Sequence, residues 1–124
     1  MKNLTVPQII RMHELLIEQT GGTFGVRDNS LLESALYSPF QTFGGKELYP
    51  TILDKVSRIT FGIISNHPFI DGNKRIGILV MLTTLELNNI QLNCTDDELI
   101  HLGLKLASGE MSNEDLLLWI KIRL

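Results

Sequence analysis

Apolar residues recur at spacings of three and four along most of this chain, which predicts helices rather than strands. The clearest run lies between 51 and 66, where Val56, Ile59 and Ile63 fall on one helical face. A second run, from about 73 to 88, is apolar on nearly every side, as is typical of a helix buried at the centre of a fold. In chain order, the six helices that we expect span about 5–20, 30–37, 51–66, 73–88, 95–107 and 112–124.

Start and stop signals frame most of these helices. A capping box, in which Ser or Thr is followed three residues later by a side chain that can bond back to it, occurs four times. The pairs are Thr5 with Gln8, Ser30 with Glu33, Thr95 with Glu98, and Ser112 with Asp115. Gly21-Gly22 ends the first helix and Pro39 stops the second. The sequence therefore predicts an all-α fold, a compact bundle of about six helices.

One segment departs from the helical pattern. Residues 40–49 carry Phe43-Gly44-Gly45 at their centre, which suits a small β-hairpin, although two-stranded ribbons are marginal alone. An ordinary loop between helices explains the same residues equally well. No alternating apolar and polar run elsewhere is long enough to predict a strand.

Length and composition narrow the class of protein. A chain of 124 residues with 44% hydrophobic content predicts one domain, 1–124, with a hydrophobic core. The net charge of −3 argues against a broad phosphate-coating surface, so we expect no nucleic-acid binding. The single cysteine, Cys94, excludes an internal disulfide, which suits a reducing cytoplasm. We expect no membrane span, because the uncharged run 76–85 is far shorter than the ~20 residues that a bilayer requires.

The stretch most suited to chemistry runs from His67 to Gly77. Gly72 permits a turn that a Cβ would hinder, and Asn73 then begins the central helix. The first turn of a helix exposes unpaired N–H groups and the positive end of the helix dipole, which together favour an anion. Lys74 and Arg75 oppose that dipole by about 0.3–1 kcal/mol each, so we expect a phosphate group to lie beside them.

Two further residues of this loop complete a predicted site for phosphate chemistry. Asp71 offers the hard oxygen ligand that suits Mg²⁺ carried by a phosphate. His67 offers a general base near neutral pH. Taken singly, each residue has an ordinary explanation as a helix cap or a solvated charge, but their clustering around a Gly-Asn turn favours a site. His13 and His101 lack metal-ligand spacing, and we expect them to be surface or half-buried helix residues.

The loop resembles the HxFx[D/E]GNxR signature of the Fic/Doc superfamily, and Lys74 in place of the second glycine makes it similar to the Doc (death-on-curing) toxins. Three other segments also look like Doc sequence, in the expected order: Gly25 to Asp28, Leu31 to Leu36, and Phe43 to Pro50. The resemblance implies a Fic/Doc-like helical fold in which segment 40–49 forms a flap that holds the target protein. The candidate flap residues are Phe43, Gly44, Gly45 and Lys46.

The resemblance also implies a role for each residue of the motif. His67 matches the general base that takes a proton from a hydroxyl group of the target protein. Phe69 matches the buried residue that fixes the loop, and Asp71 matches the acid that orients Mg²⁺. The residues that match a cradle for the phosphates of ATP are Gly72, Asn73, Lys74 and Arg75. The roles of Arg27 and Asp28 are left open, since a helix cap explains Asp28 as well as a site role does.

Positions 74 and 78 indicate which reaction the resemblance implies. Enzymes of the superfamily that transfer AMP have a glycine and a second arginine there, whereas this chain has Lys74 and Ile78. Both departures look like Doc, whose members resemble protein kinases that transfer the γ-phosphoryl group of ATP to a Ser or Thr hydroxyl. The implied target is elongation factor Tu, so that translation stalls. AMP transfer, or a non-catalytic binding module on the same scaffold, is the alternative.

A toxin of this kind requires restraint. The inhibitory segment of the superfamily, [S/T]xxxE[G/N], is absent, because no glutamate of this chain is followed by Gly or Asn. The resemblance therefore implies a type II toxin-antitoxin system with an antitoxin of the Phd type acting in trans. We expect a flexible antitoxin segment to lie over the site and to present an acidic residue near Arg75.

Overall fold

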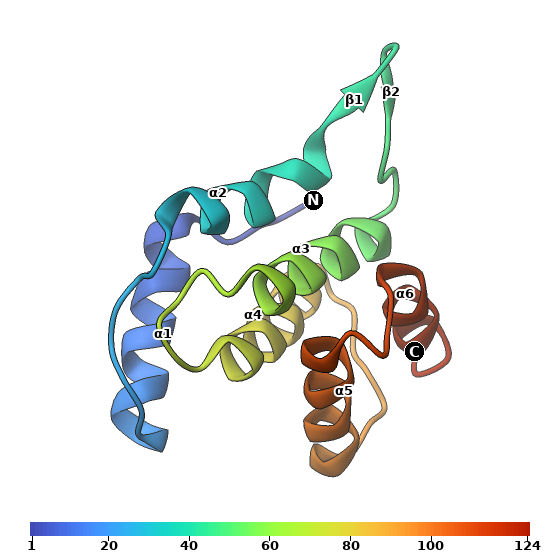
Figure 1. Cartoon of the computed structure of the whole chain (residues 1–124). Coiled ribbons are helices and arrows are strands. Elements are labelled where there is room, and N and C mark those ends of the chain that lie inside the picture. Colours follow the sequence, from blue (N-terminus) through green and yellow to red (C-terminus); the bar gives the residue numbers. More distant parts are fainter.

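The computed structural model describes all residues from 1 to 124, and helices account for most of them (Figure 1). The elements in chain order are α1 (Val6–Thr20), α2 (Asn29–Tyr37), the 3-10 turn η1 (Ser38–Phe40), β1 (Thr42–Phe43), β2 (Lys46–Glu47), α3 (Ile52–Asn66), α4 (Asn73–Leu87), α5 (Asp96–Ser108) and α6 (Asn113–Lys121). The six helices confirm the predicted all-α fold. α6 ends three residues earlier than the sequence pattern predicted.

Local capping signals explain where most of the helices begin. Complete capping boxes are present at Thr5, Thr51, Thr95 and Ser112. The predicted cap at Ser30 is wrong, because the carboxylate of Asp28 caps α2 instead. It accepts the N–H groups of Ser30 and Leu31 at 3.0 and 3.3 Å, so the helix begins at Asn29. An ionised cap also gains from the helix dipole, which a serine does not.

Helices α3 and α4 lie side by side, and each contributes to both hydrophobic clusters of the protein. Ile63 of α3 and Ile76 of α4 belong to the first cluster, which α1 and α2 close. Ile64 and Met81 belong to the second cluster, which α5 and α6 close. The prediction that α4 is a buried central helix is confirmed, and α3 shares that position. None of the helices combines the length and the apolar character needed to cross a membrane.

The segment after α2 forms a hairpin, which is one of the two alternatives that the sequence left open. β1 and β2 pair antiparallel with Phe43 opposite Lys46, and Gly44-Gly45 makes the turn. Both glycines have positive φ angles, 59° and 78°, as a two-residue turn between twisted strands requires. At the base of the hairpin, the ammonium group of Lys55 on α3 donates to the Glu47 carboxylate at 3.1 Å. The hairpin stands away from the helices, and Phe43 is 80% exposed (Figure 1).

The close approach of α3 and α4 depends on Gly77. A Cβ at this position would lie 2.9 Å from the Ile64 Cδ1 atom and closer still to Cγ1, and Ile64 is fully buried. We therefore expect Gly77→Ala to lower the free energy of unfolding by about 1–3 kcal/mol, the usual effect of overpacking a core. Urea denaturation of the two proteins measures the difference.

Gly103 of α5 provides the matched control, since it also lies inside a helix. A Cβ there would meet the Lys74 Cβ and the Ile78 Cγ1 at 3.7 Å, which is ordinary van der Waals contact. Gly103→Ala is therefore expected to leave stability unchanged or to raise it by up to about 1 kcal/mol, the helix propensity of alanine over glycine. An equal loss in both variants would contradict the packing explanation.

Candidate functional site

The motif loop, residues 67–72, joins α3 to α4. His67 caps the end of α3 in the left-handed conformation, with φ 51° and ψ 60°, and it is exposed. The chain then turns inward, so that Pro68 and Phe69 are buried. Gly72, which is also left-handed with φ 77°, precedes the first residue of α4. The loop thus presents a histidine to solvent while its next residues enter the first hydrophobic cluster.

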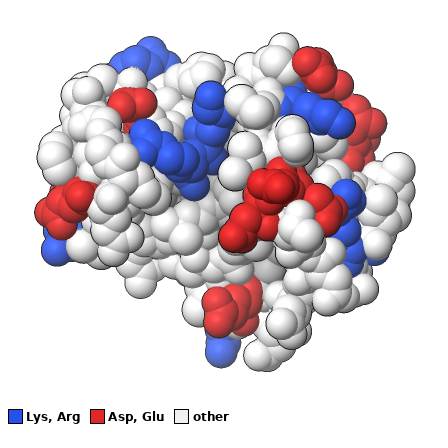
Figure 2. Space-filling model, turned by 90° about the horizontal axis from the view of Figure 1, so that it is seen from below, with Lys and Arg blue, Asp and Glu red and all other residues white.

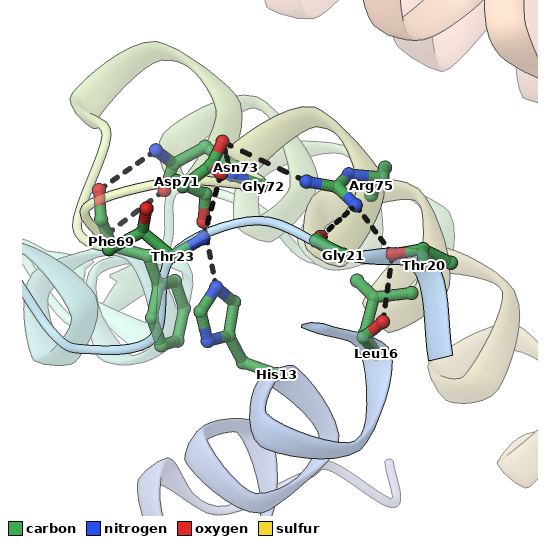
Figure 3. Close-up of polar contacts among 10 residues, drawn as sticks. All are labelled: His13, Leu16, Thr20, Gly21, Thr23, Phe69, Asp71, Gly72, Asn73 and Arg75. Atoms are coloured by element: carbon green, nitrogen blue, oxygen red, sulfur yellow. Dashed lines mark hydrogen bonds and ion pairs between the residues drawn. The ribbon is translucent and has the colours of Figure 1, made fainter. Parts of the chain in front are cut away.

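Asn73, at the first position of α4, holds the buried part of the loop (Figure 3). Its side-chain oxygen accepts the Phe69 N–H, and its side-chain nitrogen donates to the Phe69 carbonyl, both at 3.0 Å. Both bonds are buried, so they satisfy backbone groups that water does not reach. The Asn73 side chain is therefore occupied, whereas its backbone N–H, at the helix start, has no partner within the helix.

His13 of α1 supports the loop from below, and the expectation that it is a surface or half-buried residue is wrong. The side chain is 1% exposed, and its ring stacks on the Phe69 ring with centroids 3.9 Å apart. Nε2 lies 2.7 Å from the Asp71 carbonyl oxygen. Because a carbonyl only accepts, Nε2 carries the proton in this contact. Its spacing of four from Ile9 and Ile17, both buried, is the sequence signal that places His13 on the inner face of α1.

The carboxylate of Asp71 is held by backbone donors on both sides (Figure 3). The Thr23 N–H donates to Oδ2 at 3.0 Å, and the Gly72 N–H donates to Oδ1 at 2.8 Å. These two bonds, together with the positive charge of Arg75, lower the pKa of Asp71 below its usual value. Asp71 is therefore a fixed, ionised carboxylate, and its side chain is still 44% exposed.

Arg75 is directed toward Asp71 and the end of α1. Its Nη2 lies 3.7 Å from the Asp71 carboxylate, and its Nη1 donates to the Thr20 hydroxyl and, at 3.0 Å, to the Gly21 carbonyl. The turn after α1 packs closely over this pair: a Cβ on Gly22 would lie 2.5 Å from the Asp71 carboxylate. The second cation expected at the start of α4, Lys74, is exposed and forms no ion pair.

The sequence reasoning missed the partners that α1 and the following turn supply. Thr20 and Thr23 bond to Arg75 and Asp71 across 55 and 48 positions. The Gly21-Gly22 pair is visible in the sequence, but it predicted only the end of a helix and not the close approach to Asp71 and Arg75. Separations of this kind leave no local pattern, because the contacts arise only when α1 packs against α4.

The structure does not bring the hairpin to the motif loop. The hairpin precedes α3 and the loop follows it, so the two lie at opposite ends of a 15-residue helix, about 22 Å long (Figure 1). No hydrogen bond or ion pair joins the candidate flap residues Phe43, Gly44, Gly45 and Lys46 to the loop. Their role in holding a target stays a prediction.

A groove of about 740 Å³ begins at Lys74 and Arg75 and runs between α1, α4 and α5. Its other lining residues are mostly apolar: Leu16, Thr20, Ile78, Leu79, Leu82, Asp96, Leu99, Ile100, Gly103 and Leu104. Lys74 of α4 lies close to Gly103 of α5. Asp96 precedes Gly103 by about two helical turns, so it lies that far along α5 from Lys74. Figure 2, which shows the molecule from below, has basic and acidic side chains on either side of uncharged surface.

Together, these features place the positive end of α4, with its exposed Lys74, next to an exposed histidine on an all-helical scaffold. Residues 3–85, which include the whole motif loop, match the Fic/DOC family. The match covers more than half of the chain, which therefore belongs to the Fic/DOC family. The chain is also 38% identical over 72 residues to the toxin Doc of Mycolicibacterium smegmatis. That alignment covers 58% of this chain and 55% of the relative, so it spans about half the length of that protein.

The lowered pKa of Asp71 predicts how its contribution to stability depends on pH. A carboxylate whose pKa falls on folding stabilises the protein above the unfolded pKa, about 3.9, and loses this effect as the pH drops through the folded value. We expect Asp71→Asn to be less stable than the parent at pH 6, and the difference to shrink steadily below pH ~4. Urea denaturation of both proteins across this range measures it. A difference that stays constant down to pH ~2 would contradict the assignment.

Proposed function

We propose that this protein is the toxin of a type II toxin-antitoxin system, and that it transfers the γ-phosphoryl group of ATP to a Ser or Thr hydroxyl of a host protein. The observation that carries the proposal is the free cation Lys74. It lies exposed at the positive end of α4, while its neighbour Arg75 is already paired with Asp71. An exposed cation added to unpaired helix N–H groups favours a polyphosphate ligand.

Position 78 supports phosphoryl transfer over AMP transfer. Ile78 lies one helical turn beyond Lys74 and forms part of the apolar groove wall, where it faces Gly103. An arginine at this position would supply a second cation for the far phosphates, and the chain has none there. AMP transfer remains the second candidate, because the anion-binding start of α4 serves either orientation of the nucleotide.

Each residue of the loop then has a definite task. His67, exposed at the end of α3, accepts the proton of the attacking hydroxyl. The free N–H groups at the start of α4, beginning with that of Asn73, hold the phosphates together with Lys74 and Arg75 and stabilise the charge that develops during transfer. Gly72 contributes the left-handed turn before them, because its own N–H group donates to the Asp71 carboxylate.

The chemistry of Asp71 fits Mg²⁺, which neutralises phosphate charge when it is bound. The carboxylate is kept ionised by two backbone donors and remains 44% exposed, so an oxygen lone pair is accessible to a hard cation. Phe69 and Asn73 do not meet the substrate through their side chains in this proposal. They hold the loop in the shape that aligns His67 and Asp71 with the start of α4.

The proposal that this protein is a toxin is supported by its alignment over 72 residues with the toxin Doc of Mycolicibacterium smegmatis. The Fic/Doc resemblance suggests elongation factor Tu as the target, with arrest of translation in the cytoplasm as the result. An antitoxin of the Phd type is the proposed partner. The groove suits an amphipathic helix whose apolar face covers Ile100 and Leu104 and whose acidic residue reaches Arg75.

Labelled nucleotides distinguish the candidate reactions. The chain is incubated with purified elongation factor Tu, Mg²⁺ and ATP labelled at either the α or the γ phosphorus, and the mass of the target is measured. We expect the target to retain label only from the γ position. Retention from the α position would establish AMP transfer instead, and no retention of either label would favour a non-catalytic module.

His67→Ala tests the general base in the same assay. We expect the rate of transfer to fall by roughly 10²- to 10⁴-fold, the usual contribution of a general base. His101→Ala is the matched control, because His101 is exposed on α5 and does not line the groove or the loop. Equal rates for His67→Ala and the parent would exclude this role.

A pair of variants tests the proposed antitoxin surface. Ile100 of the groove and Leu118 of α6 are similarly exposed, at 61% and 60%. Ile100→Glu places a charge in the apolar groove next to Asp96, so we expect weaker binding of a co-expressed Phd-type antitoxin by at least about tenfold, from loss of apolar burial. Leu118→Glu should leave the dissociation constant unchanged. Equal affinities for both variants, measured by calorimetry, would place the antitoxin elsewhere.

A further inference from the structure

We propose that Arg27 is a positioning residue that sets the backbone conformation, and hence the direction, of His67. The inference rests on the proposed function, in which His67 is the general base. It also gives a purpose to a segment whose role the sequence left open.

The Arg27 guanidinium bonds to the backbone on both sides of His67. Its Nε donates to the His67 carbonyl at 2.7 Å, and its Nη2 donates to the Asn66 carbonyl at 2.8 Å. The Asn66 carbonyl belongs to the peptide plane before the His67 Cα atom, and the His67 carbonyl belongs to the plane after it. Because the guanidinium is planar and rigid, holding both carbonyls fixes φ and ψ of His67, and so the direction of its Cα–Cβ bond.

His67 requires such support because its conformation is unfavourable. A residue with a Cβ rarely adopts the left-handed region, and His67 does so with φ 51° and ψ 60°. The two carbonyls also lie at the negative end of α3, where they lack helical partners and where a cation is favoured. The Arg27 guanidinium holds the unfavourable backbone conformation, donates to both carbonyls and places a positive charge at the negative end of α3.

The segment that carries Arg27 is itself attached to the loop. The Arg27 and Asp28 N–H groups both donate to the Pro68 carbonyl, at 2.7 and 3.0 Å. A further bond, 3.1 Å long, runs from the Ile70 N–H to the Gly25 carbonyl. The carboxylate of Asp28 caps α2, so the segment is fixed to the scaffold at its other end. Three successive carbonyls, that of Asn66 at the end of α3 and those of His67 and Pro68 in the loop, are therefore held by Arg27 and Asp28.

Arg27→Lys is the informative substitution, because lysine keeps the charge but offers a point donor that cannot span both carbonyls. We expect kcat for target modification to fall by about 10²-fold, as a misplacement of roughly 1 Å can cause, with KM for ATP nearly unchanged. Arg11→Lys is the matched control, since Arg11 is an exposed α1 residue paired only with Glu14. Thermal unfolding of each variant shows whether the fold is intact.

The variant is then combined with His67→Ala. If Arg27 acts through His67, Arg27→Lys has no further effect on the residual rate of the His67→Ala protein. A second loss of similar size in that background would overturn the proposal, as would full activity of Arg27→Lys alone.

A spectroscopic readout separates failure of this inference from failure of the proposed function. The three-bond coupling between the amide and α protons of His67 reports its φ angle without any enzymatic assay. We expect the coupling to change in Arg27→Lys and to stay unchanged in Arg11→Lys. An unchanged coupling in a folded Arg27→Lys protein would overturn the proposal even if transfer activity is found, whereas a parent protein with no transfer activity would overturn the proposed function alone.

Discussion

The motif loop depends on the two hydrogen bonds between the Asn73 side chain and the backbone of Phe69. They link the first residue of α4 to the buried turn of the loop, both at 3.0 Å. Leaving those backbone groups unpaired in the core would cost about 1–3 kcal/mol for each group. With Phe69 fixed, its ring forms the surface on which His13 stacks, and His13 in turn bonds to the Asp71 carbonyl. Through Phe69 and His13, the Asn73 amide therefore supports the backbone that carries the Asp71 carboxylate.

Charge at the start of α4 is the second constraint. The sequence places two adjacent cations at the positive end of a helix, and the structure treats them differently. Arg75 is compensated within the chain by Asp71 and by two oxygen acceptors at the end of α1. Lys74 receives no such compensation and is exposed. The uncompensated positive charge at the start of α4 is thus that of Lys74 alone. Lys74 is also the residue that replaces the second glycine of the superfamily signature.

Features with a local cause could be predicted from the sequence, and features with a long-range cause could not. Four of the six helices begin at capping boxes, and apolar residues follow a helical spacing, so the existence and order of the helices were clear. The cap of α2 was misassigned because Asp28 and Ser30 are both good caps, and only the geometry shows which one is used. His13 and Arg27 act on residues 58 and 40 positions away, and such contacts depend on how the helices pack.

Arg75 connects the site to the groove, because it contacts Asp71 on one side and lines the groove on the other. Its distance of 3.7 Å from the Asp71 carboxylate is long for a hydrogen-bonded pair, and both side chains are partly exposed, so the attraction between them is weak. An acidic residue of a partner in the groove would compete with Asp71 for the same guanidinium. Under the proposed function, such a partner would change the charge around Asp71 and Arg75, while the backbone of His67 stays held by Arg27. Restraint would then act at the phosphate-binding start of α4, and the hydrogen bonds that hold the proposed general base would stay intact.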